Sequence, residues 1–386
     1  MNKDELETFA TIRVAGVGGS GCNSVERMMN AKLRGVEFVA INTDAQSLVN
    51  NPAPIKIQIG KETTRGLGAG SSVEIGKKSI EENKEEIYET LKGADMVFVA
   101  YGAGGGTGTG AGPMVASIAK EQGALTIGIV TKPFSFEGIR RKKVAEEGIE
   151  ELRDKVDTLI VIPNDRLLQV IDKKTSLSDA FTVVDDILRQ GVQGISDLIT
   201  EHGIINVDFA DVKTVMADAG SALMGIGRGT GDNRAVEAAR AAIDSPLLEL
   251  SIDGAKGILF NITGGPDLSM YEIDEAAKII TEAADPDANI IFGSIVDESM
   301  SGEVKITVIA TGFDEEINVK KPAKPQSQQV PSYQSYTTAQ PSPFSPLIDR
   351  AVEEPEEDIA PKPERPEPET NEDELEVPAF IRRKLK

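Results

Sequence analysis

The chain has 386 residues, of which 40% are hydrophobic and 27% charged, a balance typical of a globular protein with room for two domains. Its single cysteine, Cys22, and single histidine, His202, exclude an internal disulfide, a thiolate metal cluster and most histidine-dependent mechanisms. The formal net charge of −22 argues against nonspecific binding to nucleic acid, and no apolar stretch approaches the ~20 residues that span a bilayer. The N-terminus also lacks the basic and apolar pattern of a secretory signal, so we expect a cytoplasmic protein with no direct membrane insertion.

Strand patterns alternate with helix patterns through the N-terminal region. We expect strands at 11–17, 38–42, 96–101, 125–131 and 159–163, and helices at 22–33, 75–91, 114–121 and 139–152. This alternation predicts a doubly wound, mostly parallel α/β sheet with helices on both faces. A ligand of such a sheet binds at the carboxyl ends of the strands.

Two glycine-rich loops lie at these strand ends. Gly16–Gly21 follows the first strand and Gly104–Gly110 follows the third, and each precedes a helix. Glycine lets backbone N–H groups approach an anion closely, and a helix N-terminus adds roughly half a positive charge. Neither loop continues into Gly-Lys-Ser or Gly-Lys-Thr, which excludes a P-loop. The loops therefore predict a nucleotide whose phosphates are held mainly by backbone and hydroxyl groups.

The first loop also allows a dinucleotide-binding interpretation. It fits G-x-G-x-x-G, and Asp44 lies at the end of the second strand, where a dinucleotide-binding protein grips a ribose. A nicotinamide-dependent oxidoreductase is therefore one alternative, although a single histidine and no obvious general base provide few candidate catalytic residues for hydride transfer. A noncatalytic nucleotide-binding scaffold is another.

A long helical pattern at 178–202 precedes a second α/β unit. Apolar residues recur along it at helical spacing, which predicts a central, mostly buried helix. Beyond it we expect a smaller sheet, with strands at 221–227, 257–263, 289–297 and 303–311 and helices at 211–216, 233–245 and 270–284. The pattern predicts two domains bridged by a helix.

The composition changes from Asn318 onward. Twelve of the 20 prolines fall between Pro322 and Pro378, and residues 349–376 hold 13 acidic side chains against 3 basic ones. Such a segment buries too little apolar surface to offset its ordering entropy, so 318–373 is expected to be a disordered, acidic, Pro-rich linker. Residues 374–386 return to apolar and basic side chains, which fits either a partner-binding peptide or a frayed terminus.

Several motifs together carry a resemblance to a known family. They are the Gly104–Gly110 loop, which is the tubulin signature, and the segments 19–23, 42–46, 163–166 and 206–212. With these motifs the chain resembles the FtsZ family, the bacterial cell-division GTPases homologous to tubulin, over residues 10–313. The resemblance implies an N-terminal extension at 1–10, a GTP-binding domain at 11–177, a central helix at 178–202 and a C-terminal activation domain at 203–317.

By this resemblance the site binds GTP and GDP. Asp185 would accept paired hydrogen bonds from guanine N1–H and N2–H₂, a pattern that adenine lacks, and Phe181 would stack on the base. Taken alone, Glu137 and Arg141 fit an ordinary i,i+4 ion pair, and Phe181 fits a core position. The implied GTP-binding residues are Gly19, Ser20, Gly21, Cys22, Asn23, Gly104, Gly105, Gly106, Thr107, Gly108, Thr109, Glu137, Arg141, Asn164, Phe181 and Asp185.

The first loop departs from the family pattern at two positions. Relatives have an almost all-glycine loop, whereas Ser20 and Cys22 interrupt it here. A positive φ at Ser20 would be strained. Cys22, near a phosphate-binding helix start, fits either a thiol of lowered pKa or a buried, inert one, and we favour the latter.

Asn206, Asp208 and Asp211 lie just ahead of a helix, where acids commonly cap free N–H groups. The resemblance implies a second role, because in the tubulin superfamily this loop projects into the nucleotide pocket of the next subunit. Asp208 and Asp211 would orient a water toward the γ-phosphate, and Asn206 would complete the set of groups around that water. Mg²⁺ is the expected cation, and no metal ligand is assigned. The implied protein is a head-to-tail homopolymer whose assembly activates GTP hydrolysis.

The C-terminal peptide resembles the segment by which the family docks on membrane-tethering and regulatory division proteins of the FtsA, SepF or ZipA type. Its implied anchors are Val377, Pro378, Phe380, Ile381, Arg382 and Arg383. The resemblance thus implies a cytoplasmic protein that forms the division ring, or Z ring, at mid-cell.

Overall fold

A computed structural model describes residues 10–168, 174–201, 203–248 and 251–313. The chain divides into two units, Met1–Pro322 and Ala323–Lys386, and every described residue belongs to the first. The linker expected at 318–373 and the peptide expected at 374–386 lie outside the described residues, as does the extension up to residue 9. Within the described part, no helix has both the length and the apolarity needed to cross a membrane.

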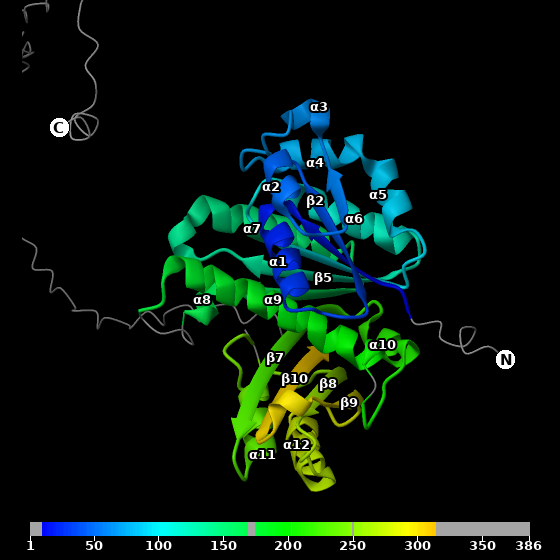
Figure 1. The fold of residues 1–386 in the computed structure, drawn as a ribbon, viewed down its shortest axis with the longest axis vertical. Coiled ribbons are helices and arrows are strands. Elements are labelled where there is room, and N and C mark those ends of the chain that lie inside the picture. The colour runs from blue at the N-terminus through cyan, green and yellow to red at the C-terminus, as the bar shows by residue number, and fades with distance from the viewer. Residues whose placement is uncertain (1–9, 169–173, 202, 249–250, 314–386) are drawn as a thin grey trace, which may run out of the picture. The chain divides into compact units, whose positions relative to one another are not determined.

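The described residues form one mostly parallel sheet. Its strands are β1 (Ile12–Val17), β2 (Val36–Asn42), β3 (Ile55–Gln58), β4 (Met96–Gly102), β5 (Leu125–Lys132), β6 (Thr158–Pro163), β7 (Gly220–Thr230), β8 (Gly257–Gly264), β9 (Asn289–Val296) and β10 (Glu303–Thr311). Their order across the sheet is β3-β2-β1-β4-β5-β6-β7-β10-β8-β9. Figure 1 shows its last four strands, β7, β10, β8 and β9, beside one another. β10 runs antiparallel to β7 and β8, and the other neighbouring strands are parallel. The expected α/β class is confirmed.

β7 joins the two parts of this sheet. Its first residues, Gly220–Ala222, pair in parallel with β6, and the stretch from Leu223 to Thr230 pairs with β10. With 11 residues, β7 extends over ~36 Å, which is long enough to serve both neighbours in succession. The smaller sheet expected after the central helix is therefore continuous with the first one.

Helices cover both faces of the N-terminal strands. The helical segments are α1 (Gly18–Asn30), α2 (Ala45–Asn50), α3 (Lys61–Thr64), α4 (Val73–Glu82), α5 (Lys84–Leu91), α6 (Thr107–Glu121), α7 (Ile139–Arg153), α8 (Asn164–Leu167), α9 (Leu177–Thr200), α10 (Phe209–Met216), α11 (Arg234–Ile243), α12 (Met270–Glu282) and the 3₁₀ turns η2 (Ser135–Glu137) and η3 (Glu298–Met300). Buried side chains of α1 and α9 belong to the core on one face, and those of α4, α5, α6 and α7 to the core on the other. α11 and α12 form a third core with β8 and β10 (Figure 1).

The helix expected at 75–91 is two helices, because Asn83 separates α4 from α5 with φ −120° and ψ 17°. The Asn83 side chain accepts a hydrogen bond from the Gly60 N–H and donates one to Glu86. Side-chain amides that bond nearby groups in this way compete with the helical ladder. The apolar periodicity of 75–91 is helical throughout, so it does not predict the break at Asn83.

The central helix expected at 178–202 is α9. Ser176 caps it by accepting a hydrogen bond from the Asp179 N–H. Phe181 and Asp185 lie in its N-terminal half, and its other end leads through the loop at 203–208 to α10. α9 thus separates the two groups of residues that the sequence singled out for nucleotide binding and for hydrolysis.

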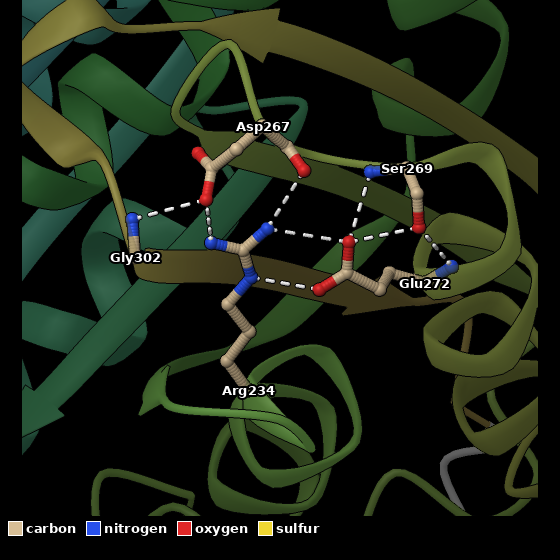
Figure 2. Close-up of polar contacts among 5 residues, drawn as sticks. All are labelled: Arg234, Asp267, Ser269, Glu272 and Gly302. Atoms are coloured by element: carbon tan, nitrogen blue, oxygen red, sulfur yellow. Dashed lines mark hydrogen bonds and ion pairs between the residues drawn. The ribbon is translucent and has the colours of Figure 1, made fainter.

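Arg234, on α11, ties α11 to the start of α12 (Figure 2). Its side chain is 7% exposed and donates to Glu272 from Nε at 2.7 Å, while Nη2 donates to the Asp267 carbonyl oxygen at 3.0 Å. Glu272 also caps α12 by accepting from the Ser269 N–H at 2.9 Å. These bonds to Arg234 lower the pKa of the Glu272 carboxyl to about 2.

Glu272→Gln is expected to reduce the free energy of unfolding by ~2 kcal/mol at pH 7, because it removes a charge-assisted bond to a buried guanidinium. A carboxyl with a lowered pKa contributes stability above its unfolded value of about 4.3, and that stability is lost as pH falls toward the folded value of about 2. The difference between variant and parent should therefore shrink between pH 5 and pH 3 in urea unfolding. Glu282→Gln, at an exposed site on the same helix, is the control. An equal difference at pH 3 and pH 7 would contradict this account.

Candidate functional site

The two glycine-rich segments pack against each other, backbone to backbone. Gly18–Gly21 already belongs to α1 and Thr107–Gly110 to α6, so both helices begin earlier than the expected starts at 22 and 114. Gly18 has φ +72°, and a Cβ built on it would lie 2.8 Å from the Gly108 nitrogen. A Cβ on Gly21 would lie 2.3 Å from the Ala100 carbonyl oxygen. The glycines therefore allow the start of α1 to touch the start of α6 at the carboxyl ends of β1 and β4.

Both helices begin without side-chain caps. Their first turns contain no acidic residue, and neither Val17 nor Gly106 at the N-cap position makes a side-chain capping bond. N–H groups of two helix N-termini, each at the positive end of a helix dipole, thus lie close together. Gly19 is open, since a Cβ built there meets nothing within 4 Å. This arrangement suits an anion with several oxygens, such as a polyphosphate.

A cavity of about 340 Å³ opens beside these helix starts. Eight of the residues expected in the site line it, namely Gly19, Ser20, Asn23, Glu137, Arg141, Asn164, Phe181 and Asp185. A second cavity, of about 680 Å³, shares Glu137 and Arg141 and has Gly104 and Thr109 in its wall. Residues that are far apart in the sequence therefore meet where the parallel strands end.

The Phe181 ring forms part of the wall of the 340 Å³ cavity and is supported by two further aromatic rings. Phe181 lies edge-on to Phe134, with ring centroids 5.6 Å apart, and Phe134 stacks on Phe136 at 5.0 Å. Phe134 is buried, whereas Phe181 is 39% exposed at the cavity. A ring that is supported from behind and open in front can stack on a flat ligand.

Glu137 and Arg141 form the i,i+4 ion pair that their spacing permits, with Oε2 and Nη1 2.8 Å apart. Glu137 Oε1 also accepts a hydrogen bond from the Phe134 N–H at 2.9 Å. Glu137 ends η2 and Arg141 lies in the first turn of α7, with Gly138 between them at φ +100°, so the pair joins two elements and is not the ordinary helix interaction that the spacing suggested. The pair is thus held at the cavity wall.

Asp185 is buried in the cavity wall and is held from α1. Ser24 Oγ donates to its Oδ1 at 3.0 Å, and Arg27 Nε donates to its Oδ2 at 2.8 Å. Burial raises the pKa of the Asp185 carboxyl, while the bonds from Arg27 and Ser24 lower it. Asn164 is also buried there, and its Oδ1 has no hydrogen-bond partner among the described residues. A buried acceptor without a donor marks a place where a ligand donor fits.

The segment 206–211, which carries Asn206, Asp208 and Asp211 and is called the acidic loop below, lies away from this cavity. Asp208 caps α10 by accepting the Asp211 N–H at 2.8 Å, the Asp208 N–H donates back to Asp211 Oδ2 at 3.3 Å, and Asn206 Oδ1 accepts the Gly203 N–H at 2.7 Å. All three of these side chains are nonetheless exposed. Along α9, Phe181 and Thr200 are ~29 Å apart at 1.5 Å per residue, and the loop begins beyond Thr200. The loop is therefore out of reach of the cavity in its own chain.

Comparisons with known proteins agree with this geometry. The Tubulin/FtsZ family GTPase domain matches residues 11–172, and the FtsZ family C-terminal domain matches 220–314. An FtsZ dimer from M. jannaschii is 44% identical, with a TM-score of 0.77, over 81% of this chain and 93% of that one. The chain belongs to the FtsZ family.

Other solved structures extend the comparison. A mutant of M. jannaschii FtsZ is 46% identical over 79% of this chain and 92% of that one, with a TM-score of 0.77. CetZ2 from Haloferax volcanii shares the fold, with a TM-score of 0.67 at 20% identity over 80% of this chain and 95% of that one. As a member of the FtsZ family, the chain is a GTPase that binds GTP and GDP. The oxidoreductase interpretation of the first glycine loop is therefore wrong.

Ser20 and Cys22, the two departures from the FtsZ pattern, are accommodated without strain. Ser20 lies in the first turn of α1 and is not among the residues with positive φ. The Cys22 thiol is buried, faces the Gly16 and Ile41 carbonyl oxygens at 3.7 Å each, and has its pKa raised to about 12 by burial. Its side chain is thus turned into the core, so Cys22 offers the cavity no side-chain contact.

The other residues expected in the second loop lie at the start of α6. Thr107 Oγ1 is 2.7 Å from Thr43 Oγ1, and Thr109 Oγ1 accepts the Gly104 N–H at 2.9 Å, so both hydroxyls help to hold the loop. Gly106 and Gly108 are buried, whereas Gly105 is partly exposed.

Sequence reasoning missed residues that the fold brings to the site. Ser24 and Arg27 touch Asp185, and Gly70 and Ser72 line the larger cavity. The signal for Arg27 was present, because it lies one helical turn after Asn23 on the same face of α1. The contact with α9 spans 158 positions, which no local pattern reveals.

Proposed function

We propose that the chain polymerises head to tail in a GTP-dependent manner and hydrolyses GTP at the interface between successive subunits. The separation of the acidic loop from the cavity carries this proposal. Asp208 and Asp211 are exposed, yet they cannot reach the cavity of their own chain. A head-to-tail contact would bring the loop of one subunit to the cavity of the next, and such contacts generate open filaments when they do not close into rings.

In this proposal the glycine loops hold the phosphates of GTP. Backbone N–H groups at the starts of α1 and α6, among residues 19–23 and 105–109, would bind the oxygens, since the Gly104 N–H already donates to Thr109 Oγ1. Glu137, Arg141 and Asn164 would contact the ribose and phosphate region. Phe181 would stack on the base and Asp185 would accept its N1–H and N2–H₂. The orphaned Asn164 Oδ1, the open Gly19 and the uncapped starts of α1 and α6 support this placement.

Mg²⁺ fits the donors available. It is commonly held by substrate phosphates and one or two carboxylates, and it neutralises charge on the transferred phosphoryl group. Asp208 and Asp211 of the neighbouring subunit are exposed carboxylates that could share such an ion. Within the described residues of one chain, no group of three or more His, Cys, Asp or Glu could hold a metal.

The neighbour's loop supplies the hydrolytic groups in this proposal. Asp208 and Asp211 orient and polarise a water toward the γ-phosphate, and Asn206 completes the shell. Phosphoryl transfer depends mainly on positioning and charge stabilisation, so a few well-placed groups suffice. Loss of the γ-phosphate then weakens the contact, and filaments turn over.

GTP turnover per molecule is expected to fall when the protein is diluted, because each active site needs two subunits. Phosphate release measured at saturating GTP over a wide range of protein concentrations should show a threshold. Light scattering should rise at the same concentration. A specific activity that is constant on dilution would contradict hydrolysis at an interface.

We further propose that these filaments form the Z ring at mid-cell in the cytoplasm, with the C-terminal peptide docking on membrane-tethering division proteins. The anchors Val377, Pro378, Phe380, Ile381, Arg382 and Arg383 lie outside the described residues, so they remain predictions. Deleting 375–386 is expected to leave polymerisation and GTP turnover unchanged and to abolish recruitment to the membrane. Loss of polymerisation in this deletion would instead assign the segment to the folded unit.

A further inference from the structure

Arg27 reaches Asp185 from α1 and clamps one face of α9. Its Nε donates to Asp185 Oδ2 at 2.8 Å, and its Nη2 donates to Thr182 Oγ1 at 3.0 Å. Ser24, nearly one turn earlier on α1, donates to Asp185 Oδ1 at 3.0 Å. Each oxygen of the carboxylate therefore already accepts one hydrogen bond from α1.

These hydrogen bonds from α1 leave a defined number of acceptor sites on the Asp185 carboxylate. An ionised carboxylate has about four acceptor sites, two on each oxygen. With one site on each oxygen filled from α1, one on each is left for the cavity that Asp185 lines. Two adjacent acceptors match the N1–H and N2–H₂ donors of guanine. A protonated carboxyl, with one donor and one acceptor, would instead match the N1 acceptor and N6 donor of adenine.

The charge state of Asp185 is therefore as important as its orientation. The Asp185 side chain is 11% exposed, and burial disfavours its ionised form. The Arg27 guanidinium on α1 opposes that effect by direct contact. Two other carboxylates are paired elsewhere: Glu137 with Arg141 in the cavity wall, and Asp186 with Arg189 on α9.

We propose that Arg27 and Ser24 are positioning residues for base selection, which hold the Asp185 carboxylate charged and with one free acceptor site on each oxygen toward the base. The inference rests on the proposed guanine contact of Asp185. It adds that guanine specificity is set by the contact between α1 and α9, through two side chains that do not line the cavity.

The test measures GTP and ATP affinities of the full chain between pH 5 and pH 8, using fluorescent nucleotides. Arg27→Met keeps an apolar stem and removes the cation. It is expected to lower GTP affinity ~10- to 100-fold at pH 7 and to narrow the preference for GTP over ATP. Because the Asp185 carboxyl then protonates more readily, GTP binding should be lost at a higher pH in Arg27→Met than in the unaltered protein. Arg27→Lys keeps the charge, so its GTP affinity, and the pH at which it loses GTP binding, should lie between those of Arg27→Met and the unaltered protein.

A merely structural Arg27 would lower the melting temperature without moving the pH profile. An Arg27→Met protein with the parental pH profile and the parental GTP-to-ATP ratio would overturn the proposal. Asp185→Asn tests the underlying guanine contact separately, because its amide presents one acceptor and one donor and should favour xanthosine triphosphate over GTP. If Asp185→Asn switches preference and Arg27→Met changes nothing, the Arg27 inference fails alone. If Asp185→Asn keeps the GTP preference, the guanine contact itself fails.

Discussion

Asp211→Ala is expected to bind GTP with the affinity of the unaltered protein and to hydrolyse it at least ~100-fold more slowly, which is the typical cost of removing one well-placed electrostatic group. Binding should be preserved because Asp211 is exposed and lies beyond the far end of α9 from the cavity. Filaments of this variant should form with GTP and fail to turn over. Nucleotide binding, phosphate release and light scattering measure the three properties separately.

Asp211 also stabilises α10, so a loss of activity needs a control for folding. The Asp208 N–H donates to Asp211 Oδ2, and such a cap contributes ~1 kcal/mol. Asp211→Asn keeps a carbonyl acceptor for this bond and removes the charge. It should melt like the parent and still hydrolyse GTP slowly, whereas Lys213→Ala, on an exposed site of the same helix, should change neither property. Parental turnover in Asp211→Asn would show that the carboxylate acts only as a cap.

Gly19→Glu is expected to abolish measurable GTP binding while leaving the fold intact. A Cβ at Gly19 meets nothing within 4 Å, and the backbone there is not in the left-handed region, so the side chain can be accommodated. A carboxylate ~4 Å from a phosphate charge costs about 4 kcal/mol at an effective dielectric constant of 20, which corresponds to ~1,000-fold in affinity. Nucleotide binding and circular dichroism together measure this outcome.

Two matched variants separate charge at the phosphate site from damage to the loop. Thr281→Glu adds the same charge on an exposed position of α12 and should bind GTP normally. Gly21→Ala adds only a methyl group, but that group would lie 2.3 Å from the Ala100 carbonyl oxygen, so it should destabilise the fold. GTP binding by Gly19→Glu at the parental affinity would remove the first glycine loop from the site.

Much of the site was predictable because its signals are local. A glycine loop between a strand and a helix is a short-range pattern, and parallel strands bring their carboxyl ends to one edge. These signals placed the two glycine-rich segments, Gly16–Gly21 and Gly104–Gly110, around one ligand. Asn23, Glu137 and Asp185 were added to the site only by the resemblance to FtsZ, because their local patterns equally fit an ion pair or a helix surface. The same resemblance, rather than any spacing, suggested that Asp211 acts on a neighbour.

The remaining features depend on contacts that the sequence pattern does not contain. The division of β7 between β6 and β10 is a matter of strand pairing, and periodicity alone cannot distinguish one sheet from two. Asn83 breaks a helix through its bond to Gly60, which lies 23 positions earlier. Arg27 became part of the site only when α1 packed on α9. The exposed or buried state of Cys22 was likewise decided by the tertiary fold.

Mixing two inactive variants tests the central claim most directly. Asp211→Ala retains an intact nucleotide pocket, and Gly19→Glu retains an intact acidic loop, so each variant carries one half of the proposed interface site. Phosphate release is measured for Asp211→Ala at constant concentration while Gly19→Glu is added in excess. The account predicts turnover well above the sum of the two variants alone, because the loop of one subunit completes the pocket of the other. A mixture no faster than that sum would contradict hydrolysis at the interface and would place the catalytic groups within one chain.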